Sequence, residues 1–252
     1  MPSQVRGRST YRLLRIALLV PFLIGIGMMI GFRVQAFLFE SKVHSVVSRL
    51  ERLQLDQSSE REVLRSLPEL KPGIVWNFYV NGRPDETCHG DSCYVLRDGN
   101  VWNGLVFRLR ERMNYQRDWI FWSLYWLGHR YQSFASYVEI RNGKVSRYEY
   151  ALAVSDQEYP LGGLVGVHVL GADRASFPAG YGFFDDYSEI AGFRTRQPSN
   201  MIGKVLYVAF TPSAQATQIH AAFDVHLDCL WSSRGCSATK QILPGLWKSM
   251  SN

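Results

Sequence analysis

The longest apolar stretch of the chain lies near its N-terminus. Residues 13–32 are apolar except for Arg15, and a helix of that length rises about 30 Å, which matches the hydrocarbon core of a bilayer. Cationic flanks of such helices are retained in the cytoplasm. Here the N-terminal flank holds Arg6, Arg8, Arg12 and Arg15. The pattern predicts a single-pass membrane anchor with a cytoplasmic N-terminus and an extracytoplasmic C-terminal domain.

A cleaved signal peptide is the alternative for the same stretch. The sequence VQA at 34–36 places small or aliphatic residues where signal peptidase cleaves, and cleavage near Ala36 would release a secreted protein. The apolar run 16–32 is longer than the usual signal core of about 7–15 residues. Arg33 also follows it directly. Both features favour an uncleaved anchor.

The pattern then changes to amphipathic helix and afterwards to strands. Apolar residues recur at i, i+3, i+4 and i+7 within 37–55. Ser59 and Glu62 have the spacing of a capping box at the start of a second, short helix. The expected divisions are therefore a basic tail with the anchor (1–36), a membrane-proximal helical segment (37–72) and an exported β-rich globular domain (73–252).

The β-rich part consists of strand-like runs separated by turns. Asn-Gly and Asp-Gly pairs between such runs are the strongest short-range signal of a β-hairpin, and Asn142 with Gly143 forms one such pair. We expect seven or eight mostly antiparallel strands, over 74–80, 93–96, 101–109, both arms of 136–154, 164–170, 204–210 and 217–230. The predicted fold class is α+β, with a transmembrane helix, a membrane-proximal helical pair and a mostly antiparallel sheet.

One aromatic-rich segment interrupts the strands. Residues 118–129 are apolar almost all round and too short to span a bilayer. The first interpretation is a buried helix packed on the sheet. The alternative is a helix in the membrane interface, with Trp119, Trp122 and Trp126 at the depth of the lipid headgroups.

Charge is unevenly distributed along the chain. Of its 28 basic and 22 acidic residues, six and one lie in residues 1–42, which leaves 22 and 21 in the exported part. The net charge of +6 therefore belongs mainly to the anchor. A nucleic-acid-binding domain needs a basic face on its folded part. The charge balance thus argues against nucleic acid as a partner.

All four cysteines follow the anchor, as Cys88, Cys93, Cys229 and Cys236. An even number in an oxidising compartment predicts two disulfides, with three possible connectivities. A four-thiolate zinc site is the alternative. Its usual C-x2-C spacing differs from the C-x4-C and C-x6-C found here.

The best candidate for a metal site lies on the predicted strand 217–230. Side chains of the same parity point to the same face of a strand, and this set consists of His220, Asp224, His226 and Asp228. Imidazole and carboxylate are ligands for divalent metals. The same set is equally typical of the solvent face of a half-exposed strand. No other cofactor is predicted.

A second candidate surface lies within residues 171–200, which show little regular periodicity. Connections of this length are functional or mobile. Aromatic and acidic residues are mixed at its centre, at Tyr181, Phe184, Asp185, Asp186 and Tyr187. These side chains predict either a ligand surface for a sugar or a cation, or a loop packed on itself.

No diagnostic catalytic motif accompanies these features. We therefore expect a non-enzymatic, membrane-anchored binding or interaction module of the cell envelope, with a protein, lipid or glycan partner. Gly27 and Gly31 have the small-xxx-small spacing of associating membrane helices, which predicts a homo-oligomer. The alternative is a membrane-tethered hydrolase, with or without a metal, that uses the His and Asp side chains of strand 217–230.

Overall fold

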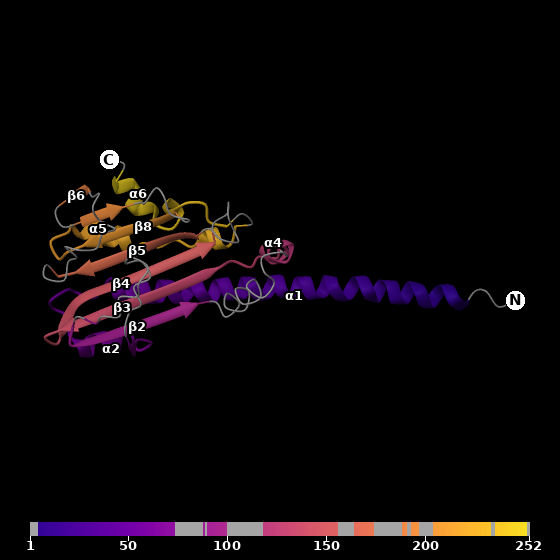
Figure 1. Cartoon of the computed structure of the whole chain (residues 1–252), viewed down its shortest axis with the longest axis horizontal. Coiled ribbons are helices and arrows are strands. Elements are labelled where there is room, and N and C mark those ends of the chain that lie inside the picture. The colour runs from indigo at the N-terminus through magenta and orange to yellow at the C-terminus, as the bar shows by residue number, and fades with distance from the viewer. Residues whose placement is uncertain are drawn as a thin grey trace.

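In the computed structural model, a long N-terminal helix runs out of one side of a β-sheet and projects far beyond it (Figure 1). The structure describes residues 5–73, 88, 90–99, 118–155, 164–173, 188–190, 193–196, 204–232 and 235–250. The predicted α+β class is confirmed.

Helix α1, Val5–Leu50, joins the predicted anchor to the folded domain without a break. Its 46 residues include Pro21 and rise about 70 Å. Most of the apolar side chains described along the first half are exposed, namely Leu19, Val20, Phe22, Leu23, Ile24, Met29 and Ile30, while Ile26 and Met28 are half-buried. This helix is long and apolar enough to span a membrane.

The second half of α1 is amphipathic and belongs to the core of the domain. Its buried residues recur every three or four positions, at Phe32, Ala36, Phe39, Val43, Val46, Val47 and Leu50. This spacing places them on one face of the helix. The amphipathic helix predicted over 37–55 is thus the continuation of the anchor helix, up to Leu50.

Helix α2, Glu60–Ser66, follows after a short turn and has the predicted capping box. The Glu62 amide donates to Ser59 Oγ at 3.4 Å, and the Ser59 amide donates to Glu62 Oε2 at 2.7 Å. The turn before α2 is bonded to the sheet, because the Val145 amide donates to the Ser58 carbonyl at 2.9 Å.

The sheet contains eight strands among the described residues, in the spatial order β1-β2-β3-β4-β5-β8-β7-β6. Within the described part of the sheet, only the pairing of β5 with β8 is parallel. The strands are β1 Lys71–Pro72, β2 Ser92–Gly99, β3 Gln132–Arg141, β4 Lys144–Ser155, β5 Leu164–Ala172, β6 Ser188–Ile190, β7 Phe193–Arg196 and β8 Lys204–Phe210. The expectation of a mostly antiparallel sheet is confirmed.

Individual strand predictions have different outcomes. The hairpin at Asn142 and Gly143 is confirmed, and both residues have the positive φ values, 52° and 71°, that a tight hairpin turn requires. Predicted strands 74–80 and 101–109 lie outside the described residues. The stretch 171–200 is more regular than its sequence predicts, because it includes β6 and β7.

One face of the sheet carries the hydrophobic core. Side chains from β2, β3, β4, β5 and β8 pack there with the amphipathic half of α1 and with α5, Ala216–Phe223. Tyr150 Oη donates to the Ala222 carbonyl at 2.5 Å. The Phe223 ring contacts the rings of Tyr148, Tyr150 and Phe210. The core therefore depends on segments from both ends of the chain.

The predicted strand over 217–230 is wrong. Its residues form α5 and then the 3-10 helix η1, Asp228–Leu230, and the chain continues through η2, Thr239–Gln241, to α6, Pro244–Met250. Apolar residues at Ile219, Ala222 and Phe223 satisfy the i, i+3, i+4 spacing of a helix, and Ala222 and Phe223 are buried. The alternation of apolar residues beyond this point is therefore not evidence of a strand.

The aromatic segment forms helix α4, Asp118–Trp126. Tyr125 is buried, but Trp122 is 41% exposed and Trp126 is 78% exposed. The first interpretation, a helix buried on the sheet, is therefore wrong for this half of α4. In Figure 1 the helix lies beside α1, on the side of the domain from which α1 projects.

Candidate functional site

The predicted His and Asp set does not form a single site. His220 lies on α5, and its Nδ1 atom is 2.7 Å from Oε1 of Glu51, just after α1. His226 Nε2 pairs separately with Asp224 Oδ1 at 3.2 Å, after α5 has ended. Asp228 is exposed in η1. These side chains cannot share a strand face, because residues 217–230 form helices and a connecting loop and contain no strand.

A metal site is likewise not supported in the described part of the chain, where no three His, Cys, Asp or Glu side chains are grouped to hold an ion. The hydrogen bond and the charge of Glu51 raise the pKa of His220. This interaction favours the protonated ring, which does not bind metal. The hydrolase alternative thus loses the strand on which it was based.

Both pairs of cysteines form disulfides between sequence neighbours, Cys88 with Cys93 and Cys229 with Cys236. All four thiols are therefore used, and the zinc alternative is excluded in this state. The second predicted surface, Tyr181, Phe184, Asp185, Asp186 and Tyr187, lies outside the described residues.

A buried ionic cluster lies on the face of the sheet opposite the hydrophobic core. Glu149 on β4 is 6% exposed; its Oε2 atom accepts from Arg147 Nη2 at 2.9 Å and lies 3.2 Å from Nε2 of His168 on β5. Burial alone would raise the pKa of Glu149, but Arg147 and His168 outweigh it and lower the pKa to about 2. Glu149 is therefore ionised at neutral pH and bound on two sides.

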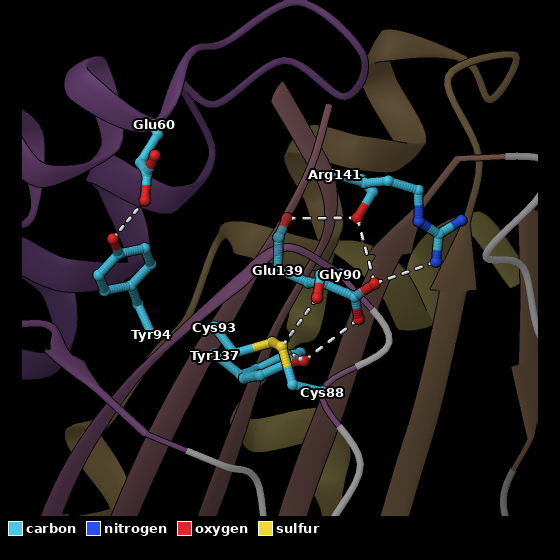
Figure 2. Close-up of a disulfide and its surroundings, with 9 residues drawn as sticks. Glu60, Cys88, Gly90, Cys93, Tyr94, Tyr137, Glu139 and Arg141 are labelled. Atoms are coloured by element: carbon cyan, nitrogen blue, oxygen red, sulfur yellow. Dashed lines mark hydrogen bonds and ion pairs between the residues drawn. A yellow bond between two sulfur atoms is a disulfide. The ribbon is translucent and has the colours of Figure 1, made fainter. Parts of the chain in front are cut away.

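The cluster continues to the disulfide on β2 (Figure 2). Tyr137 Oη lies 2.9 Å from Cys93 Sγ and 3.2 Å from Glu139 Oε2, and Glu139 Oε1 pairs with Arg141 at 3.2 Å. The Arg147 guanidinium is 5.6 Å from the centre of the Tyr137 ring. Burial and the charge of Glu139 raise the pKa of Tyr137. A general base needs the opposite shift, so this arrangement favours a structural role.

The sequence contained only part of the signal for this cluster. Equal spacing from the hairpin turn predicted at Asn142 would place Glu139 opposite Ser146, whereas a β-bulge between Glu139 and Ile140 shifts the register and places Glu139 opposite Arg147. Opposite charges at facing positions stabilise a strand pair. The alternation of polar residues along these strands, however, is also typical of a solvent-exposed face, and only the structure distinguishes the two.

An open groove of about 590 Å³ lies where α1 turns into α2. Its lining is mainly polar and consists of Arg49, Arg52, Leu53, Gln54, Gln57, Ser58, Glu62 and Ser66. Arg49 is fixed by two bonds to the Glu69 carboxylate, at 2.8 and 3.1 Å. Arg52 is exposed. In Figure 1, α2 lies at the side of the domain farthest from the N-terminus.

No known protein family, no curated protein and no solved structure matches this chain.

Proposed function

We propose that this chain is a non-enzymatic, membrane-anchored interaction module of the cell envelope, which holds a protein partner at a fixed height above the membrane. The observation that carries the proposal is the continuity of α1. Val43, Val46 and Leu50 are at most 1% exposed in the core of the domain, and the same helix carries the stretch that is long and apolar enough to span a membrane. With this stretch in the membrane, the anchor and the domain are rigidly coupled. An enzyme that must reach many substrates would instead need a flexible tether.

The proposed topology is a single-pass protein with a cytoplasmic N-terminus. The arginines before the anchor support this orientation, and two disulfides support an oxidising compartment for the domain. Cleavage near Ala36 would remove contacts that the domain uses. Phe32 and Ala36 are buried, and Arg33 Nη1 donates to the Trp231 carbonyl at 2.6 Å. These contacts support an anchor that stays attached.

The groove between α1 and α2 is the surface that we assign to the partner. Arg52 is 14 residues beyond Leu38, the last exposed apolar residue of α1, and this places the groove roughly 20 Å farther along the helix axis. That height is beyond the reach of lipid headgroups. Exposed Arg52 and the amide side chains Gln54 and Gln57 suit a polar, acidic segment of another protein.

Site-specific photo-crosslinking in the native membrane tests this proposal. A photoreactive residue at Gln57, in the groove, should give one crosslinked species of defined mass. The same residue at Lys240, which is exposed on η2, is the matched control and should not give that species. Arg52→Glu should abolish the crosslink from Gln57 because it reverses the charge offered to the partner.

The proposal is wrong if both positions crosslink alike or if neither gives a defined species. A crosslinked species of twice the mass of the chain identifies a second copy as the partner. Association through Gly27 and Gly31 remains a separate prediction. A Cβ at either glycine would meet no atom within 4 Å, so that part of α1 has room for another helix.

A further inference from the structure

Two contacts fix the position of the segment after α4 along α1. The Cδ2 atom of Leu127 is 3.9 Å from the position that a Cβ would take on Gly25. The ring of His129 meets the ring of Phe32 edge-on, with centroids 5.2 Å apart. Gly25 and Phe32 are two helical turns apart, so from Leu127 to His129 the segment follows α1 for about 10 Å toward the C-terminal end of that helix.

The depth of the contact at Gly25 follows from the length of α1. Gly25 is ten residues beyond Arg15, the last arginine of the cytoplasmic flank, which corresponds to about 15 Å along a helix. The hydrocarbon core of a bilayer is about 30 Å thick. With Arg15 at the inner surface, Gly25 and the Leu127 side chain beside it lie near the middle of the bilayer.

The outward face of α1 indicates where the bilayer ends. Val34, Phe37 and Leu38 are 52%, 56% and 61% exposed. The next exposed positions on the helix are polar, beginning with Ser41. The outer boundary therefore lies just beyond Leu38 and not at Phe32, where the apolar stretch of the sequence ends. Leu38 is about 35 Å from Arg15 along the helix, and a tilt of α1 fits this length into a core of about 30 Å. The domain therefore lies partly within the outer leaflet.

Two arginines near the depth of Phe32 are hydrogen-bonded by other groups of the protein. Arg130 is 4% exposed; its Nη1 atom donates to the carbonyls of Tyr125 and His129 at 2.6 and 2.9 Å, and its guanidinium lies 3.7 Å from the centre of the Tyr125 ring. Arg33 likewise donates to the carbonyl of Trp231. Buried charges are tolerated in apolar surroundings when they are satisfied in this way.

The exposed side chains of α4, in contrast to these arginines, are mainly apolar. Trp122 and Trp126 are 41% and 78% exposed, and both are large, mainly apolar rings whose removal from water is favourable. We propose that α4 is embedded in the outer leaflet beside α1, with Trp122 and Trp126 against the lipids. This inference rests on the proposed anchor, because it requires α1 to cross the membrane.

Thiol accessibility in the full-length protein, in its membrane, tests the inference. Single Trp126→Cys, Ile30→Cys and Ser45→Cys variants are treated with a membrane-impermeant maleimide, and the native cysteines are protected as disulfides. A thiol must ionise to react, so in hydrocarbon it should be labelled at least about tenfold more slowly than in water. Labelling is expected at position 45 only, and at all three positions after denaturation in detergent.

The outcomes separate the inference from the proposed function. Rapid labelling of the Trp126→Cys variant with Ile30→Cys protected overturns the embedding of α4 and leaves the anchor intact. Rapid labelling of both variants overturns the anchor as well. A photoreactive residue at position 126 should form adducts with lipid, and a crosslink to a second protein chain instead would refute the assignment of lipid as the neighbour.

Discussion

The ionic cluster at Glu149 predicts a specific acid sensitivity. The pKa of Glu149 is lowered from the usual 4.5 to about 2 in the folded protein. A carboxyl with a lowered folded pKa stabilises the fold above its unfolded pKa and loses this contribution as the pH falls toward the folded value. At about 1.4 kcal/mol per pKa unit, the full contribution is about 3 kcal/mol, of which about 2 kcal/mol is lost between pH 7 and pH 3.

Glu149→Gln removes this contribution directly. Breaking a buried ion pair by removing one partner costs about 3–5 kcal/mol, so the variant should be less stable than the wild type at pH 7. Because it lacks the titrating group, its stability should fall by about 2 kcal/mol less than that of the wild type between pH 7 and pH 3. The difference in the free energy of unfolding between the variant and the wild type is therefore smaller at pH 3 than at pH 7.

Denaturant unfolding of the full-length protein in detergent micelles, followed by near-ultraviolet circular dichroism, measures both effects. Asp228→Asn is the matched control, because Asp228 is exposed, and its unfolding should follow the wild type at both pH values. If Glu149→Gln destabilises the protein equally at pH 7 and pH 3, the assigned interaction of Glu149 with Arg147 and His168 is wrong.

Two further substitutions test the packing. Val46→Ala removes a fully buried side chain of α1 from the core and should lower the free energy of unfolding by about 1–3 kcal/mol, whereas Ala at exposed Ser45 should change it little; equal effects would contradict the packing of α1 on the sheet. Gly166→Ala would place a Cβ 2.5 Å from the Leu152 carbonyl oxygen, so β4 and β5 must separate and the melting temperature should fall, and an unchanged melting temperature would contradict this close approach.

Local signals in the sequence were sufficient for several elements. The capping box at Ser59, the turn at Asn142 and strand β8 each depend on residues close together in the chain. The region 217–230 was not predictable in the same way, because Ile219 and Phe223 fit both a strand and a helix. Packing of Phe223 against Tyr148, Tyr150 and Phe210 favours the helix, and that contact is not local.

Candidate sites were harder to predict than elements. The His and Asp set depended on one strand assignment and was lost with it. Prediction of the ionic cluster required both the strand register and the burial of Glu149. The alternation of polar and apolar residues alone does not show whether the polar face of a strand is buried. The position of α4 depends on the approach of Leu127, the residue after this helix, to Gly25, which is about a hundred residues earlier in the chain.

The continuity of α1 has a consequence for biogenesis. In the proposed orientation the buried face of α1 leaves the membrane early, yet it is covered by segments translated much later, because Glu40 and Arg33 bond to Trp231 across 191 and 198 residues of sequence. Folds dominated by such distant contacts form slowly. At a synthesis rate of about 5–20 residues per second, the apolar stripe on α1 waits on the order of ten seconds or more for its partners. A nascent chain halted before Phe223 should therefore require a holding chaperone on the far side of the membrane.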